Sequence, residues 1–372
     1  MSDLVPDAEE ARVTPRYFEK LEGKTSTLQC TLCPHLCRFT RDGVGRCGVR
    51  GMADGLPWLP FAGQVSARTM DPIEKKPLFH FHPGEKVYSV GFLGCNLHCP
   101  FCQNYGISQV VPDSEAVHNA AARNAVTPSR VTAGGSSIAP ANLVASANLV
   151  APADLVASAR ESGSFGIAYT YNEPGIHFEY VLECAELAHQ AGLKNILVTA
   201  GYLQPEPARE LLRYMDAANV DLKGWRTSFY RELGGSLEPV LEFLRIAQEL
   251  THLEVTTLLI PGHNDDPSDL HELFSFVAEL GPDVPLHISA FHPIPGTEFN
   301  APSTPPEAIL AAVEQARAHL HYVYPGNITA PAHTHCPSCT KQVIRRHGYH
   351  VSTPGLTNSG NCASCGTKIV VY

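Results

Sequence analysis

Along much of the chain, short apolar runs alternate with segments in which apolar residues recur every three or four positions. Six apolar runs end in polar or glycine-rich residues: 86–94, 165–174, 193–202, 219–224, 253–262 and 285–293. Segments with helical periodicity lie between several of them: 176–192, 206–217, 237–250 and 269–281. Strands that alternate with helices are typical of parallel strands joined by crossover helices. The pattern therefore predicts an α/β fold built on a partial parallel barrel of the (β/α)6 type.

A segment rich in alanine, serine and asparagine interrupts this alternation at residues 113–160. It contains three similar hexapeptides, ANLVAS, ANLVAP and ADLVAS, which indicate a duplication within a flexible insertion. We expect the early part of the insertion to be disordered, because it has few apolar residues to bury. Its last part, residues 152–163, keeps a helical pattern and is expected to supply a helix of the barrel.

The composition indicates a folded globular protein. The chain has 372 residues, of which 44% are hydrophobic and 17% are charged, enough apolar side chains for one large core or two ordinary ones. Its formal net charge of -10 provides no basic field, so nucleic acid and anionic membranes are poor candidates for partners. We find neither a signal peptide nor an apolar stretch long enough to cross a bilayer, and we therefore expect a cytoplasmic protein.

Twelve cysteines in a chain expected in the cytoplasm indicate metal binding or catalysis rather than disulfides, because that compartment keeps thiols reduced. Eleven of them fall into three clusters: Cys30, Cys33, Cys37 and Cys47; Cys95, Cys99 and Cys102; Cys336, Cys339, Cys362 and Cys365. Cys184 stands alone in a helical segment, where a small core residue is the simplest interpretation.

The first and last clusters each have four members. Paired C-x2-C motifs in the last cluster are the arrangement that closes a tetrahedral thiolate site around zinc, so we predict a zinc ribbon there. The first cluster is less regular, and three nearby glycines supply the turns that let its thiolates converge. Zinc is our first interpretation of that cluster and an auxiliary iron-sulfur cluster the alternative, because spacing alone does not distinguish them. His35 is an alternative ligand there.

The middle cluster, in the sequence GCNLHCPFCQNYG, has only three cysteines. Three thiolates on one loop hold three irons of a 4Fe-4S cluster and leave the fourth iron with an open coordination position. A zinc site completed by His98 is the structural alternative, although His98 lies inside the loop itself. The missing fourth thiol therefore favours a cluster whose open iron binds a reactive molecule.

The C-x3-C-x2-C row, with the aromatic Phe101 before its last cysteine, resembles the signature of radical SAM enzymes. The resemblance implies that S-adenosylmethionine (SAM) chelates the open iron and is cleaved by one electron to a 5'-deoxyadenosyl radical, which abstracts hydrogen from a substrate. It also implies a low-potential electron donor of the flavodoxin or ferredoxin type.

Residues at the strand ends match positions that bind SAM in this superfamily. In TYNEP, Asn172 and Glu173 occupy the place of a Gly-Gly-Glu-Pro-like sequence that accepts the SAM ammonium group, although Tyr171 and Asn172 replace both glycines. Similarity to the pyruvate formate-lyase activating enzyme extends the set of implied cofactor-binding residues to Thr199, Asp221, Lys223 and His271. Lys223 is expected to pair with the SAM carboxylate, and His271 to lie near the ribose.

Several unrelated motifs in the same order, among them GIAYTYNEP, FYRELGG, LIPGHND and HISAFHP, resemble the AmmeMemoRadiSam-system radical SAM enzymes from Cys30 to the C-terminus. The resemblance implies Memo-like and AMMECR-like proteins as partners. The substrate is not implied. Histidines near or at strand ends are candidate substrate contacts: His80, His82, His287 and His292. His292, after the last predicted strand, is our candidate catalytic residue.

Two other functions remain open at this point. One is activation of a glycyl-radical enzyme, in which the hydrogen comes from a glycine backbone of a partner protein. The other is a non-catalytic interaction scaffold held by three zinc sites. We predict four parts of the chain: an N-terminal cysteine-rich module, 1–55; a connecting segment, 56–84; a radical SAM barrel, 85–330; and the C-terminal zinc ribbon, 331–372.

Overall fold

The computed structural model, which describes residues 13–22, 27–112, 131–133, 148–295 and 297–372, is built around one eight-stranded sheet. The order across the sheet is β18-β17-β16-β15-β14-β13-β9-β8. The bounds of these strands are β8 Ala67–Pro72, β9 Lys86–Gly91, β13 Gly166–Thr170, β14 Lys194–Thr199, β15 Ala217–Asp221, β16 His252–Leu259, β17 Leu286–Ala290 and β18 Val323–Gly326. Neighbouring strands from β9 to β18 are parallel, and β8 pairs with β9 in the antiparallel direction.

The six predicted apolar runs overlap the six strands β9 and β13 to β17, so the predicted α/β fold with a mostly parallel sheet is confirmed. The structure has one more parallel strand than the predicted six. This strand, β18, has only four residues and ends in Pro325 and Gly326, so it lacks a strand-like apolar run. The partly polar edge strand β8 also went unpredicted.

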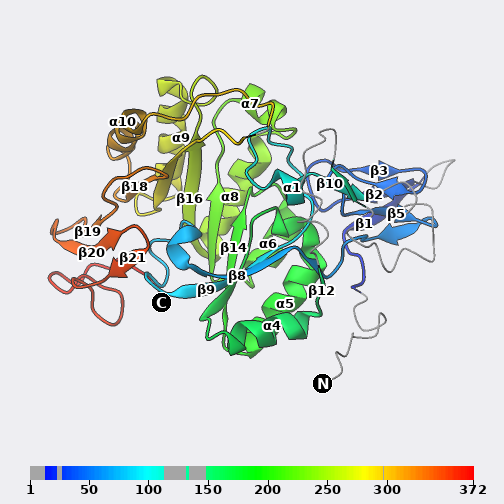
Figure 1. Cartoon of the computed structure of the whole chain (residues 1–372), viewed down its shortest axis with the longest axis horizontal. Coiled ribbons are helices and arrows are strands. Elements are labelled where there is room, and N and C mark those ends of the chain that lie inside the picture. The colour runs from blue at the N-terminus through cyan, green and yellow to red at the C-terminus, as the bar shows by residue number, and fades with distance from the viewer. Residues whose placement is uncertain (1–12, 23–26, 113–130, 134–147, 296) are drawn as a thin grey trace.

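Helices join the parallel strands and pack against the sheet (Figure 1). Their bounds are α4 Pro152–Glu161, α5 Phe178–Gln190, α6 Pro205–Leu212, α7 Thr227–Glu232, α8 Glu238–Leu250, α9 Pro267–Leu280 and α10 Pro306–Ala316. Each of the longer ones buries one apolar face; in α8 this face is Val240, Phe243, Leu244 and Ala247, spaced three or four residues apart. Helix α4 is the helix predicted at the end of the insertion. Most of the preceding part of that insertion, 113–130 and 134–147, lies outside the described residues.

The N-terminal cysteines lie in or between the strands of two small antiparallel sheets. These sheets pack on the α/β domain of the eight-stranded sheet, the part of the chain predicted as a barrel and called the barrel below. One sheet contains β1 Phe18–Leu21, β2 Thr27–Cys30 and β3 Arg38–Phe39, and the other β4 Gly43–Val44, β5 Gly51–Ala53 and β6 Leu56–Trp58. Strand β6 carries this module slightly beyond the predicted boundary at residue 55. Leu28, Leu32 and Phe39 share one apolar core with residues of the barrel, so the module and the barrel are continuous.

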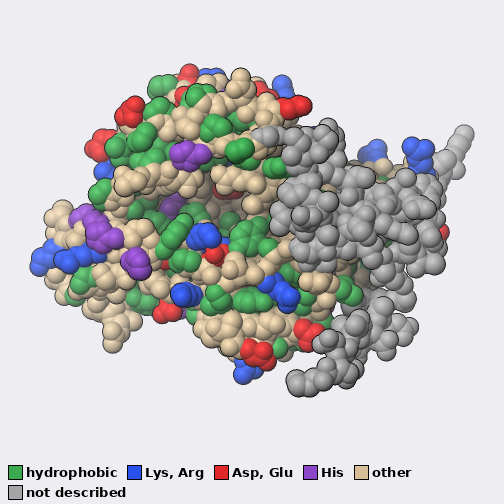
Figure 2. All heavy atoms as spheres, in the orientation of Figure 1, with side chains coloured by type: hydrophobic (Ala, Val, Ile, Leu, Met, Phe, Trp, Pro, Cys, Tyr) green, Lys and Arg blue, Asp and Glu red, His purple; other side chains and the backbone are tan. Residues whose placement is uncertain are grey.

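The C-terminal module contains a three-stranded antiparallel sheet of β19 Thr334–His335, β20 Gln342–His347 and β21 His350–Ser352. Cys336 and Cys339 lie between β19 and β20, and Cys362 and Cys365 follow β21. Figure 1 shows this ribbon on the opposite side of the barrel from the N-terminal module. Buried Arg346 attaches it to the barrel by donating a 2.6 Å hydrogen bond to the Phe79 carbonyl oxygen. Figure 2 shows histidines and basic side chains gathered on the outer face of the ribbon.

None of the helices in the described part of the chain has the length and apolar character that crossing a bilayer requires.

Candidate active site

A cavity of about 360 Å³ opens at the carboxyl ends of the parallel strands. Its walls come from the loop after β9 and from the ends of several strands, where Thr170, Thr199, Asp221 and Ser289 each contribute a polar group. In parallel α/β folds this end of the sheet carries the functional side chains, because the loops that follow the strands meet there. The predicted strand-end residues are therefore brought to one place.

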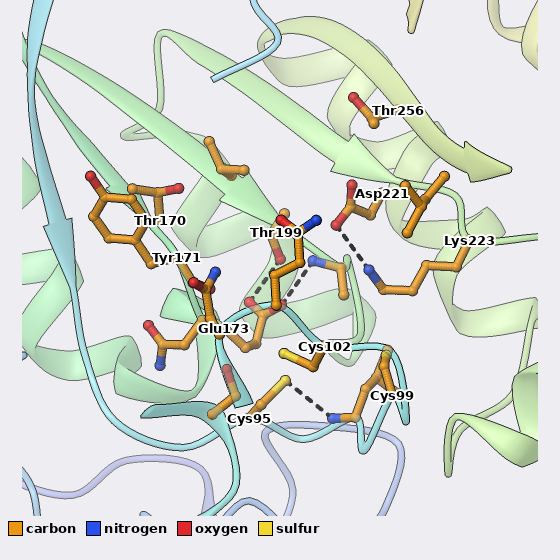
Figure 3. Close-up of a pocket in the computed structure, with 18 of the residues that line it drawn as sticks. Cys95, Cys99, Cys102, Thr170, Tyr171, Glu173, Thr199, Asp221, Lys223 and Thr256 are labelled. Carbon is orange, nitrogen blue, oxygen red and sulfur yellow. Dashed lines mark hydrogen bonds and ion pairs between the residues drawn. The ribbon is translucent and has the colours of Figure 1, made fainter. Parts of the chain in front are cut away.

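The three thiols of the middle cluster line this cavity together (Figure 3). Burial raises the pKa values of all three thiols, and it raises that of Cys99 to about 12. Within the described part of the chain, the cavity lining contains no fourth cysteine and no histidine, so His98 does not complete a ligand set in it. Three convergent thiols with space beside them are the ligand set that a 4Fe-4S cluster with one open iron requires.

Glu173 is held rigidly beside the thiols. Its Oε1 accepts hydrogen bonds from the Gly175 backbone N–H at 2.9 Å and the Thr199 hydroxyl at 2.7 Å, and its Oε2 accepts one from the Ala200 backbone N–H at 2.8 Å. Only 1% of its surface is exposed. Burial raises the pKa of Glu173, and these hydrogen bonds offset the effect only in part. The carboxylate is fixed in position and keeps a lone pair on Oε2 for a further donor.

Asn172 and Thr199 act on the site through other groups. The side-chain amide of Asn172 accepts a hydrogen bond from the Phe92 backbone N–H at 3.0 Å and donates one to the Gly94 carbonyl oxygen at 2.7 Å. It therefore holds the chain that leads into Cys95. The Thr199 hydroxyl holds Glu173 and accepts a hydrogen bond from the Gly201 N–H. Both side chains line the cavity, as predicted, and their observed hydrogen bonds are to the protein itself.

Asp221 and Lys223 form an ion pair in the cavity wall, with Nζ 2.9 Å from Oδ2 (Figure 3). Burial alone would lower the pKa of Lys223, but the adjacent Asp221 carboxylate raises it above its ordinary value. The lysine is therefore charged, and it lines the same cavity as Cys99. A fixed ammonium group beside the thiols suits an anionic ligand group.

Sequence analysis did not predict that four side chains in or beside the cavity interact with one another. Lys76 is 2% exposed and pairs with Asp71 at 2.7 Å, and Tyr171 donates its hydroxyl hydrogen to the same carboxylate at 2.6 Å. Lys75 also reaches Asp71, at 3.0 Å. Asp71 belongs to β8, and both lysines belong to the turn after it. Because β8 was not predicted from the sequence, these residues could not be placed near the cavity.

The remaining predicted cofactor residues fall in different places. Phe101 lines the cavity, and its ring stacks on Phe229 with the ring centroids 6.1 Å apart. His271 is exposed on α9 and does not line the cavity; its ring packs against His319. Its position gives no support to the predicted role near the ribose.

The candidate substrate histidines do not line the cavity. His292 is exposed beyond β17 and contacts the Asn327 carbonyl oxygen at 3.0 Å. His80, His82 and His287 lie at or before the opposite ends of the strands. There His287 pairs with buried Glu254 at 2.7 Å, and His80 contacts the C-terminal ribbon at the Ile369 carbonyl oxygen. These three side chains connect the barrel to the segments packed beneath it, which explains why His80 and His287 are buried and His82 half-buried without a role in substrate binding.

The C-terminal cysteines converge as predicted. The Sγ atoms of Cys336, Cys339, Cys362 and Cys365 all lie within 4.8 Å of one another, so the four thiols form a group that could hold a metal ion. The pKa of the Cys365 thiol is lowered to about 6, chiefly by a hydrogen bond from Thr367. Zinc as the bound metal stays a prediction.

Comparison with known proteins identifies the family. The radical SAM superfamily pattern matches residues 90–277, and an uncharacterized protein of Methanocaldococcus jannaschii is 34% identical over 366 residues, 95% of this chain and 97% of that protein. The chain belongs to the radical SAM superfamily. Membership implies enzyme catalysis with a 4Fe-4S cluster and SAM, which confirms the predicted class. Assignment to the AmmeMemoRadiSam system stays a prediction.

Two further proteins are similar over part of the chain. The 4-hydroxyphenylacetate decarboxylase activating enzyme of Clostridium scatologenes is 22% identical over 139 residues, 36% of this chain and 44% of that protein. A domain of a pyruvate-formate lyase-activating enzyme from Bacteroides vulgatus is similar in structure, with 19% identity, a TM-score of 0.39, and coverage of 44% of this chain and 99% of that domain.

Proposed function

We propose that this radical SAM enzyme binds its 4Fe-4S cluster through Cys95, Cys99 and Cys102 and abstracts hydrogen from a substrate held in the same cavity. The supporting observation is that three thiols, with no fourth among the described residues of the lining, share one cavity with fixed charged groups. When bound, the cluster and SAM supply a 5'-deoxyadenosyl radical by one-electron cleavage of the sulfonium.

Different residues of the cavity bind different groups of SAM. Lys223, charged and adjacent to the thiols, binds the carboxylate group, and Asp221 keeps the lysine in place. The free lone pair of Glu173 accepts from the ammonium group. Asn172 and Thr199 act as positioning residues, because one fixes the entry to the cysteine loop and the other fixes Glu173. Phe101 supplies an apolar wall.

The substrate occupies the part of the cavity lined by Lys76, Tyr171, Ser289 and Asn327. These groups are polar, and burial lowers the pKa of Lys76, which the Asp71 carboxylate raises only in part. A substrate with hydrogen-bonding groups fits this wall better than a purely apolar one. Enclosure of the reacting carbon protects the radical from water and oxygen.

Electron paramagnetic resonance on protein purified without oxygen and reduced with dithionite tests the proposal. We expect a reduced 4Fe-4S signal that SAM perturbs, and formation of 5'-deoxyadenosine. Cys95→Ala should abolish both, whereas Cys184→Ala, at a buried core cysteine outside the three clusters, should retain both. Full SAM cleavage by the Cys95→Ala protein would refute the cluster assignment. Zinc alone after anaerobic reconstitution of the wild-type protein would instead favour the non-catalytic scaffold.

A second candidate function is activation of a glycyl-radical enzyme, favoured by the partial similarity to a 4-hydroxyphenylacetate decarboxylase activating enzyme. The observation that decides between the two is a glycyl radical in a glycyl-radical enzyme encoded near this protein, formed after incubation with the reduced protein and SAM. Without such a radical, the Memo-like and AMMECR-like proteins become the first partners to test for binding. Electron supply by a flavodoxin or ferredoxin in the cytoplasm completes the proposal.

A further inference from the structure

The four N-terminal cysteines surround a second, small cavity. Strand β2 ends at Cys30, and the turns that follow bring Cys33, Cys37 and Cys47 to the same space. All four cysteines line this cavity. Apolar side chains close the cavity: Leu32, Phe39 and Ile176. This is a built thiol site on the barrel's flank, separate from the cavity described above.

The distances between the thiols distinguish this site from a tetrahedral zinc site. Zinc–sulfur bonds of about 2.3 Å in a tetrahedron place the sulfurs about 3.8 Å apart. The C-terminal ribbon has this spacing, with the Sγ atoms of Cys336 and Cys365 3.4 Å apart. Among the described cysteines, histidines and acidic residues, only the ribbon has three or more ligand atoms within 4.8 Å of one another.

The N-terminal thiols are therefore spread more widely than ligands of a single ion, as are Cys95, Cys99 and Cys102. An iron-sulfur cluster requires this wider spread, because its cysteines bind different irons that are separated by sulfide. Gly45 lines the same cavity, and a Cβ there would lie 3.1 Å from the Cys37 Sγ, closer than most such contacts. The backbone thus leaves room beside the thiol.

A buried cation faces the same space. Arg50 is 2% exposed, lines the cavity, and pairs with the Glu179 carboxylate through two hydrogen bonds of 2.7 and 2.9 Å. Its Nε–H has no partner with good hydrogen-bond geometry within the described chain, and the Cys30 thiol beside the guanidinium is the nearest group of the cavity that can accept from it. A buried donor without a partner is unfavourable. A cluster with four thiolate ligands is anionic and supplies both a sulfur acceptor and a counter-charge.

The cavity adjoins the catalytic cysteine loop. His35, between two of the thiols, lines it and donates from Nε2 to the Asn96 carbonyl oxygen at 2.7 Å, and Asn96 follows Cys95 directly. A Cβ on Gly94 would lie 2.5 Å from the Cys47 carbonyl oxygen, so the two loops are in van der Waals contact. A path through bonded atoms and one hydrogen bond therefore joins the two sets of thiols.

We propose that Cys30, Cys33, Cys37 and Cys47 bind an iron-sulfur cluster that exchanges single electrons with the cluster on Cys95, Cys99 and Cys102. The exchange rests on the proposed function, whereas the iron-sulfur site itself does not. A low-potential one-electron donor, such as a reduced flavodoxin or ferredoxin, reduces the N-terminal cluster by one electron. The same electron then reduces the catalytic cluster, so the N-terminal cluster returns to its oxidised state and no bond is made or broken.

Metal analysis of a variant without the catalytic cluster tests the site. In the full chain carrying Cys95→Ala, Cys99→Ala and Cys102→Ala, we expect iron and acid-labile sulfide, together with a reduced paramagnetic signal that SAM leaves unchanged. Cys184→Ala is the matched control and should keep the full iron content. A triple variant that contains zinc but no iron or sulfide after anaerobic reconstitution overturns the proposal.

The wild-type protein gives a second test that does not depend on folding of a variant. We expect more iron per chain than the four atoms of one 4Fe-4S cluster. An iron content of only four atoms per chain, with zinc bound instead of the additional iron, would also overturn the proposal. If the catalytic cluster is absent but iron remains on the N-terminal cysteines, the proposed function fails and the iron-sulfur site stands.

Electron exchange has its own readout. In fully reduced wild-type protein, two adjacent paramagnetic clusters should broaden each other's resonance, and the broadening should vanish in the triple variant. His35→Phe removes the hydrogen bond to Asn96 and should slow reduction of the catalytic cluster by a flavodoxin at unchanged iron content. Equal flavodoxin-driven reduction rates in His35→Phe and wild type, without spin coupling, would refute the exchange.

Discussion

The hydroxyl group of Tyr171 lies 2.6 Å from the Asp71 carboxylate, which joins the end of β13 to the edge strand β8. Tyr171 has a φ of 72°, in the left-handed region that favours glycine. Glycine is what the superfamily pattern predicts there. The hydrogen bond and the Lys76 ammonium, 4.5 Å from the centre of the tyrosine ring, hold this conformation in place. Such a conformation costs about 1–3 kcal/mol and persists where the surroundings fix it.

Removal of the Asp71 charge should destabilise the fold strongly. Asp71→Asn leaves the Lys76 ammonium buried without its counter-charge, and loss of one partner of a buried pair typically costs about 3–5 kcal/mol. Urea denaturation at neutral pH measures the loss. The half-exposed Lys75 offers the control, because Lys75→Ala should change stability by only about 0.5 kcal/mol. Equal stability of Asp71→Asn and wild type would show that the pair is not structural.

The strands that could be predicted from the sequence are those whose burial requires apolar residues. Strands at the centre of a parallel sheet are covered on both faces, so they appear as continuous apolar runs, of which Ile196 and Leu197 in β14 are examples. Edge strands carry no such signal. Asp71 and its neighbours in β8 are partly polar because one edge of that strand has no partner in the sheet.

The site could be predicted where its residues are close in sequence. The cysteine loop is recognisable because Cys95, Cys99 and Cys102 are fixed by local spacing, and Glu173 and Lys223 follow predicted strands. Which end of a strand a residue occupies is harder to judge. His287 begins β17 instead of ending it, so it lies at the far side of the sheet from the cavity. The partners of Glu173 come from a different strand, which spacing alone does not reveal.

Neutralisation of Lys223 should weaken the binding of SAM without loss of the cluster. A charge-assisted hydrogen bond contributes about 1.5–3 kcal/mol, so Lys223→Gln should lower SAM affinity roughly tenfold to a hundredfold. The measurement is the SAM concentration that half-perturbs the signal of the reduced cluster, at unchanged iron content. Lys86→Gln, at the opposite and exposed end of β9, is the matched control. An unaltered SAM affinity in Lys223→Gln would exclude the lysine from the binding site.

Loss of a ribbon thiol should unfold the C-terminal segment locally. The ribbon's own core is small, comprising chiefly Val343, Ile344, Ile369 and Val370, and metal binding and folding are coupled in such modules. Cys336→Ser should lower the zinc content and open exposed Lys341 and Arg345 to trypsin, while the barrel stays intact. Cys184→Ala should be digested like the wild type. Unchanged trypsin resistance together with unchanged zinc in Cys336→Ser would remove the case for a structural metal.

Acid should destabilise the junction between ribbon and barrel before it affects the carboxylates. The Nδ1–H of His80 donates to the Ile369 carbonyl oxygen at 2.6 Å, and in the neutral imidazole Nε2 accepts from the Tyr324 hydroxyl, 2.6 Å away. This arrangement requires neutral imidazole. Burial lowers the pKa of His80 to about 4; Arg346 and His252 also lower it, and Glu254 and the bond to Ile369 raise it only in part.

The sign of the pH effect follows from these values. The unfolded chain binds a proton at His80 near pH 6.5 and the folded chain only near pH 4, so the stability is complete above about pH 6.5 and falls as the pH drops toward 4. The pKa of Glu254 is instead lowered by His252 and His287 despite its burial, so its contribution is lost only below about pH 4.3. Urea midpoints at pH 7.5 and 5 should therefore differ less in His80→Asn than in wild type. The exposed His271→Asn should retain the wild-type difference, and an identical pH dependence in all three proteins would show that His80 is not the responsible group.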